Sequence, residues 1–242
     1  MTSKSFISFF LTKKFGKYKI LFNFAIQSAF YMKTKQPLED LKEIRRMMET
    51  SSKFLSLSGL SGISAGLVAL IGAGYAHYII RKFELKLGHF FATGRIDEAY
   101  STLEFKLFFI ALLILIFAVG FGFLFTYLTA KKKQQSLFTP VAFKLAFSLG
   151  LPLAFGGLFV ILLYLKGYYL LIAPLTLLFY GLGLLNASKY VHIEIKYLAI
   201  IQMTLGLLAL WFEPYSLYIW AFGFGVMHII YGIIMYYKYE KQ

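Results

Sequence analysis

The sequence contains no cysteine and few charged residues. Of its 242 residues 15% are charged, whereas 59% are hydrophobic and 19% are aromatic. The absence of cysteine excludes disulfides, thiolate metal sites and a cysteine nucleophile. Soluble domains carry about 25% charged residues, so this chain has too few charges to cover a surface that faces water. The composition therefore predicts a protein that resides in a lipid bilayer.

The sequence also has few of the side chains that catalytic sites require. It contains 4 histidines and no His-Glu-x-x-His zinc motif, and no pair of carboxylates lies within an apolar segment. His77 and His89 are separate residues without nearby carboxylates, so we expect no metal site and no cofactor. We therefore favour a non-enzymatic protein, although the sequence alone does not exclude enzymatic activity.

Six apolar segments are long enough to cross a bilayer, which takes about 20 helical residues. The segments are residues 54–80, 105–129, 141–165, 168–188, 195–212 and 216–237. Lys166 and Gly167 alone separate the third segment from the fourth, so these two form a tight hairpin. The predicted fold class is all-α, a polytopic membrane protein with a six-helix transmembrane domain over residues 54–242.

The first connection, from Arg81 to Glu104, is polar enough to leave the membrane. It is long enough for a short surface helix, which Gly88 and Gly94 are expected to interrupt. Asp97 and Glu98 in this connection predict a solvated face.

The net charge of +14 is concentrated at the ends of the apolar segments. Most Lys and Arg residues after Met32 fall on the side that holds the N-terminus, including Lys131–Lys133. Because positive charge marks the cytoplasmic side, we expect both termini in the cytoplasm. The charges form no stripe of the kind that binds nucleic acid, so the expected surroundings are lipid.

The N-terminal residues precede the transmembrane domain. Residues 1–31 combine lysines with a short apolar stretch, and three interpretations stay open: a signal peptide, an interfacial or disordered segment, or a non-native extension before a start at Met32. Residues 32–53 predict a cytoplasmic amphipathic helix, since apolar residues recur at helical spacing over residues 38–48. This helix lies on the inner leaflet or docks a cytoplasmic protein.

Small residues in the first span predict close helix packing. Ser58, Gly62 and Gly66 recur every four residues, a spacing that lets two helix backbones approach in lipid. The partner is another helix of the same chain or a second copy in a homodimer.

Three polar residues fall inside the later spans and are the candidates for a ligand contact or a polar interior. They are Asn186, Gln202 and His228. Polar groups in hydrocarbon are costly and need a partner or a function. Gln202 and His228 lie at similar depth on neighbouring antiparallel helices, so they predict an interhelical hydrogen bond, or a proton-handling site in which His228 titrates.

Four stretches carry a family resemblance: QPLEDLKEIR (36–45), SLSGLSG (56–62), YGLGLLNASK (180–189) and GFGVMHIIYG (223–232). Together they resemble an uncharacterised six-helix integral membrane protein family of Bacteroidetes-type bacteria, over residues 32–241. The resemblance implies a multi-pass protein of the cell inner membrane and no known activity. We therefore expect a non-enzymatic sensing, regulatory or scaffold protein, or alternatively a small transporter or channel that uses the polar residues of spans four to six.

Overall fold

The computed structural model describes residues 58–134 and 136–241, and within these ranges the regular structure is entirely helical. The α-helices are α2 (Gly59–Ala92), α3 (Ile96–Lys132), α4 (Pro140–Leu165), α5 (Ile172–Ala187), α6 (Glu194–Trp211), α7 (Ser216–Ala221) and α8 (Met227–Tyr239). Short 3₁₀ turns η1 (Tyr169–Leu171), η2 (Ser188–Tyr190) and η3 (Glu213–Tyr215) flank them, and the π-helix η4 (Phe222–Val226) joins α7 to α8. The predictions for residues 1–31 and 32–53 lie outside the described residues.

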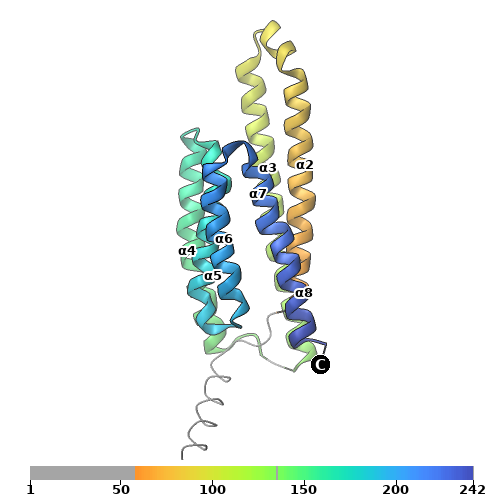
Figure 1. Cartoon of the computed structure of the whole chain (residues 1–242), viewed down its shortest axis with the longest axis vertical. Coiled ribbons are helices and arrows are strands. Elements are labelled where there is room, and N and C mark those ends of the chain that lie inside the picture. The colour runs from red at the N-terminus through yellow and green to blue at the C-terminus, as the bar shows by residue number, and fades with distance from the viewer. Residues whose placement is uncertain (1–57, 135, 242) are drawn as a thin grey trace, which may run out of the picture. The chain divides into compact units, whose positions relative to one another are not determined.

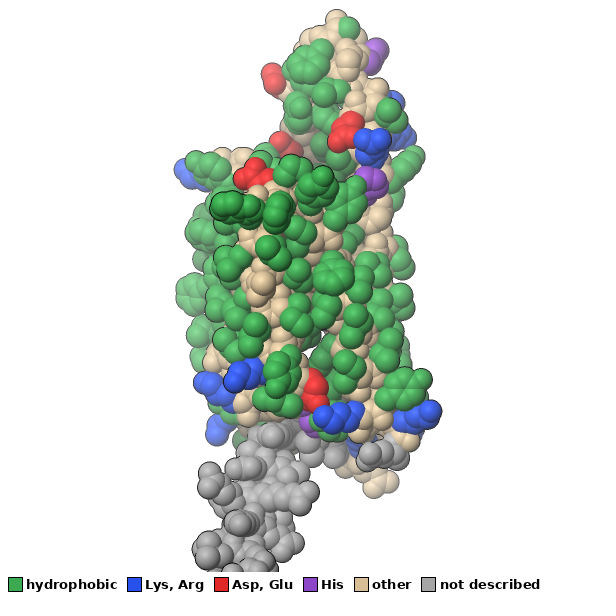
Figure 2. All heavy atoms as spheres, in the orientation of Figure 1, with side chains coloured by type: hydrophobic (Ala, Val, Ile, Leu, Met, Phe, Trp, Pro, Cys, Tyr) green, Lys and Arg blue, Asp and Glu red, His purple; other side chains and the backbone are tan. Residues whose placement is uncertain are grey.

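Six segments of this part of the chain are long and apolar enough to cross a membrane, which confirms the polytopic all-α fold. The fourth runs from Tyr169 to Tyr190 and the sixth from Glu213 to Tyr239, so the sixth includes α7, η4 and α8. Figure 2 shows hydrophobic side chains over most of the visible lateral face, with Lys and Arg near the two ends. The protein is therefore a multi-pass membrane protein.

The helices form two groups that the last span, α7 to α8, connects. Helix α2 packs along α3 and α8, and α5 packs along α4 and α6 (Figure 1). Helix α7 contacts α2, α5 and α6, and η4 contacts α2 and α6. The last span is thus the element that both groups share.

The first connection differs from its prediction. Helix α2 continues through Gly88 to Ala92, so the expected interruption at Gly88 and the separate surface helix are wrong. A glycine inside a helix lowers the stability of the helix by about 1 kcal/mol relative to alanine. The helix-forming residues on both sides of Gly88 outweigh this cost. The chain reverses at Gly94, whose φ of +68° suits glycine. The result is a long α2–α3 hairpin that extends past the other helices (Figure 1).

Candidate functional site

The small residues of α2 lie against the last span of the same chain. A Cβ atom on Gly62 would lie 3.1 Å from the Gly232 Cα, and one on Gly66 would lie 2.6 Å from the Gly225 carbonyl oxygen. A Cβ atom does not fit at Gly66, and one at Gly62 would force its neighbour to shift, so the two backbones lie in close contact. Of the two partners that the sequence leaves open, the structure shows the one within the chain.

Ser58, the first residue of the predicted packing motif, precedes the helix. Its Oγ accepts a hydrogen bond from the Leu60 N–H at 3.2 Å, which makes it the N-cap of α2. The Glu240 carboxylate accepts the Gly59 N–H and, at 3.4 Å, the Ser58 hydroxyl. A carboxylate at the positive end of the helix dipole is stabilising, so the end of α8 holds the start of α2.

The π-helix η4 provides an unusual acceptor inside the bundle. In a π-helix each N–H bonds to the carbonyl five residues earlier, and the Met227 N–H accordingly bonds to the Phe222 carbonyl. The Gly223 carbonyl therefore does not receive the Met227 N–H. It accepts instead from Gln202 Nε2 at 2.8 Å and His228 Nδ1 at 3.1 Å.

These contacts define the protonation pattern of the His228 ring. Because Nδ1–H donates to the Gly223 carbonyl, Nε2 is the acceptor of the neutral ring. The Tyr180 hydroxyl donates to this Nε2 at 2.7 Å. Gln202 Nε2 also lies 3.5 Å from His228 Nδ1, but both nitrogens donate to the same carbonyl, so they form no bond with each other. We call Tyr180, Gln202, Gly223 and His228 the polar core.

The structure thus brings two of the three predicted interior residues together. Gln202 is 0% exposed and His228 6%. Asn186 lies apart from them, and its Nδ2 donates to the Ser148 carbonyl at 2.9 Å, which joins α5 to α4. Tyr180 was missed because a tyrosine in an apolar helix resembles an interfacial residue. The two glycines of the Gly223-x-Gly225 pattern, just before His228, could have predicted an irregular helix at this point.

A second polar cluster lies at the end of the bundle where α6 begins and α8 ends. Glu194 Oε1 accepts hydrogen bonds from Lys238 Nζ and, at 3.1 Å, from the Tyr239 hydroxyl. The His192 ring stacks on the Tyr239 ring with 3.8 Å between centroids. Lys133, from the loop after α3, donates to the Tyr239 carbonyl at 3.3 Å. This cluster ties α6, α8 and the α3–α4 loop together.

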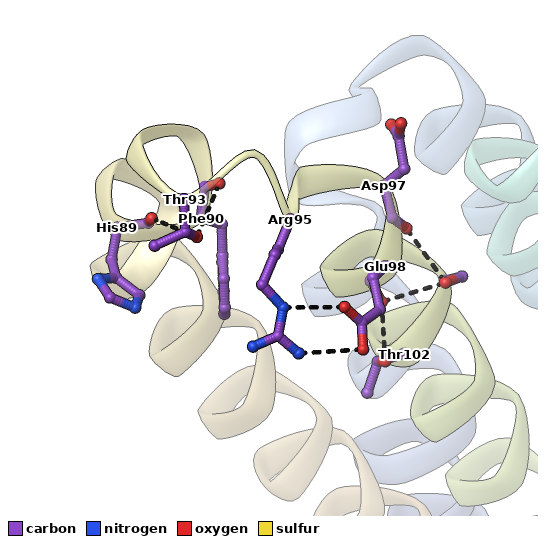
Figure 3. A network of polar contacts seen from close by, with 8 residues as sticks. His89, Phe90, Thr93, Arg95, Asp97, Glu98 and Thr102 are labelled. Carbon is purple, nitrogen blue, oxygen red and sulfur yellow. Dashed lines mark hydrogen bonds and ion pairs between the residues drawn. The ribbon is translucent and has the colours of Figure 1, made fainter.

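The α2–α3 hairpin has a third polar cluster at its tip (Figure 3). Arg95 Nε and Nη2 donate to the Glu98 carboxylate at 2.9 and 3.1 Å, and this ion pair raises the pKa of Arg95. The Phe83 ring of α2 lies 5.7 Å from Phe90 of the same helix and 4.9 Å from Tyr100 of α3, between centroids. The contact between Phe83 and Tyr100 links the two helices of the hairpin.

Ser64 lies in a sequence, Gly62-Ile63-Ser64-Ala65-Gly66, that has the spacing of the nucleophile motif Gly-x-Ser-x-Gly. That motif works at a sharp turn between a strand and a helix. Here it lies within the continuous helix α2, and the Ser64 hydroxyl donates to the Ser61 carbonyl at 3.0 Å. The glycines serve helix packing, and the arrangement is not that of a nucleophile.

Within residues 58–134 and 136–241 no group of three or more His, Asp or Glu side chains is arranged to hold a metal ion. In comparisons with known proteins, no family model matches the chain and no curated protein or solved structure is similar to it. The resemblance to the Bacteroidetes-type family stays a prediction.

Proposed function

We propose that this protein is a non-enzymatic scaffold or sensor of the cell inner membrane, with both termini in the cytoplasm. The observation that carries the proposal is the continuity of α2, which runs as one helix of 34 residues from its Ser58 cap to the hairpin tip. At 1.5 Å per residue it is about 50 Å long, whereas the hydrocarbon layer is about 30 Å thick. A displacement at the tip would therefore reach the residues that precede Ser58.

His77 of α2 contacts Tyr218 of the last span. Tyr218 Oη lies 3.3 Å from His77 Nδ1 near the start of the last span. From there α2 continues to Ala92, about 22 Å further. Leu85 and Phe91 in this extension are 84% and 62% exposed. Exposed apolar side chains among charged ones suit a protein partner on the side of the membrane that holds the hairpin tip.

The interior polar residues support a scaffold because their hydrogen bonds connect helices. Asn186 joins α5 to α4, and Gln202 joins α6 to the last span. His228 joins that span to α5 through Tyr180. These bonds hold the bundle that carries α2. On the cytoplasmic side, residues 38–48 would contact a protein partner or a second copy.

The orientation can be tested directly because the natural chain has no cysteine. Lys86→Cys places one thiol near the hairpin tip, and Lys131→Cys places one in the last turn of α3, at the opposite end of the bundle. A maleimide that does not cross membranes should label Lys86→Cys in intact spheroplasts, and Lys131→Cys only after lysis. The unmodified chain is the control for background. The reverse pattern would contradict cytoplasmic termini.

The role of the hairpin can be tested by proximity labelling from a biotin ligase fused to the C-terminus. The pair Leu85→Ala and Phe91→Ala removes apolar side chains from the tip. The matched control, Leu115→Ala and Phe117→Ala, removes the same residue types from α3, where they are 59% and 51% exposed. We expect the tip pair, and not the control pair, to change which proteins are labelled. An unchanged set with the tip pair would overturn the sensing role.

The second candidate function is a small transporter or channel, and the observation that favours it is the polar core inside the last three spans. Tyr180, Gln202 and His228 form a connected set there. In liposomes with an internal pH dye, a proton transporter would dissipate an imposed pH gradient, and His228→Gln would slow this. If the dye reports the same rate of pH change for the wild-type protein, for His228→Gln and for empty liposomes, proton transport is excluded.

A further inference from the structure

Three buried side-chain atoms of the described residues have no hydrogen-bond partner, and all three belong to residues of α6 or α8. They are Glu194 Oε2, Gln202 Oε1 and the Tyr231 hydroxyl. Buried polar atoms are nearly always paired, and the exceptions point to bound water or an ion. All three belong to the same two helices, and Gln202 Oε1 faces Gly223 at the start of the last span's irregular turn, so bound water along these helices would satisfy them. We call this region the α6–α8 seam.

The seam connects one end of the bundle to the polar core. Glu194 opens α6 and Gln202 lies eight residues further, about 12 Å along the helix. On the facing helix, Tyr231 follows His228 by one turn and is within electrostatic range of Glu194, Tyr180 and Tyr239. Tyr180 and Tyr231 also pack against the same apolar cluster. The unpartnered atoms thus extend from the Lys238 end to near the middle of a bilayer about 30 Å thick.

The chemistry of the three atoms favours water over a cation. The Tyr231 hydroxyl can donate, whereas Glu194 Oε2 and Gln202 Oε1 accept, and a water molecule can satisfy both kinds. The Glu194 charge is already balanced by Lys238. Divalent cations prefer six or more oxygen ligands with net negative charge, which this set does not provide.

We propose that buried water fills the α6–α8 seam, links Glu194 to Tyr231, and lets protons exchange between the Lys238 end and His228. The titratable groups that face this path are Tyr180 from α5, Glu194 from α6, and His228, Tyr231, Lys238 and Tyr239 from α8. His192, which stacks on Tyr239, lies at its entrance. The inference does not depend on the scaffold role.

The test uses the full chain in detergent or nanodiscs with ¹⁵N-labelled histidine. Only 4 histidines give signals, and His228→Gln assigns the one in question. We expect the His228 Nδ1–H to exchange with water. Tyr231→Phe and Glu194→Gln should slow this exchange about tenfold or more, since each removes one polar group from the path. Tyr218→Phe, which removes the hydroxyl beside His77 instead, should leave the rate unchanged.

Two outcomes would overturn the proposal. One is a His228 ring proton that does not exchange in the wild-type protein. The other is an unchanged rate in Tyr231→Phe with normal helix content and elution volume. If the variants fail to fold, hydroxyl-radical footprinting of the wild-type chain decides, because labelling requires adjacent water. Oxidation of Tyr231 would support the presence of water in the seam. Oxidation of the exposed Tyr237 without oxidation of Tyr231 would refute it.

Discussion

Helix α8 meets its two neighbours in opposite ways. Toward α2 it presents glycine, and a Cβ atom on Gly232 would lie 2.5 Å from the Gly59 carbonyl oxygen. Toward α6 it presents His228 and Tyr231, next to oxygen atoms without partners. In lipid, close backbone contact provides van der Waals attraction and polar side chains provide hydrogen bonds. One helix therefore uses both sources of stability, on different sides.

The difference separates the two functional hypotheses. At the glycines the backbones of α2 and α8 are in close contact, so we expect these two helices to move together. The α6–α8 seam consists of rotatable side chains around an irregular turn, and irregular turns of this kind are frequent at functional sites. Transmission along α2 would use the first interface, whereas proton movement would use the second.

The largest expected effect is that of Gly232→Val. The new Cβ would lie 2.5 Å from the Gly59 carbonyl oxygen and 2.6 Å from the Ile63 nitrogen, and backbone atoms cannot yield as side chains do. We expect a loss of about 3 kcal/mol in the free energy of unfolding, the upper range for overpacking. Denaturation in mixed SDS and mild-detergent micelles measures it.

The matched control for this prediction is Gly120→Val in α3. A Cβ atom at Gly120 would meet nothing within 4 Å, so the change should stay within about 0.5 kcal/mol of wild type. Equal losses in both variants would show that valine at any glycine of these helices is harmful. The contrast between the two sides of α8 would then be unsupported.

The sequence predicted that α2 has a packing face but not which helix covers it. Spacing of small residues shows where a backbone can approach, and Gly62 and Gly66 have that spacing. The partner glycines, Gly225 and Gly232, lie far along the chain, and only the tertiary fold brings them to α2. Helix existence was predictable because it depends on local hydrophobicity, whereas pairing depends on the whole bundle.

The polar core was predictable only in part for the same reason. Comparable depth on adjacent helices placed Gln202 near His228. It did not reveal that both donate to the Gly223 carbonyl, since an i to i+5 turn arises from packing and carries no sequence pattern beyond two glycines. Gly88 shows the converse error, because a local helix breaker was outweighed by the helix around it.

The second expected effect concerns the polar side of α8. Gln202→Ala removes the bond to the Gly223 carbonyl and leaves a cavity at a fully buried position. We expect a loss of about 2 kcal/mol. Gln202→Leu is the control, because it fills the volume and removes the unpartnered Oε1 together with the bond. Its loss should be about 1 kcal/mol, and a larger loss than in Gln202→Ala would contradict the cavity argument.

A smaller effect is expected for Tyr180→Phe, which removes only the hydroxyl that donates to His228 Nε2. Interhelical hydrogen bonds in membrane proteins average about 0.6 kcal/mol, and we expect a loss of this size in the same micelle assay. Tyr218→Phe at the exposed His77 contact should change stability less. A loss at Tyr218 that exceeds the loss at Tyr180 would mean that the polar core adds nothing to the bundle.

The smallest expected effect is the coupling between the two sides of α8. Gly232→Ala disturbs the contact with Gly59 and Ile63, whereas Gln202→Leu disturbs the contact with Gly223, so the two changes affect different neighbours. Changes at independent sites add within about 0.5 kcal/mol, so the double variant should lose the sum of the single losses. A double-mutant cycle in the micelle assay measures the difference. A coupling above about 1 kcal/mol would mean that α8 shifts against α6 whenever its contact with α2 changes. In that case one rearrangement would link the hairpin to the seam, and sensing and proton exchange would no longer be separate functions of separate interfaces.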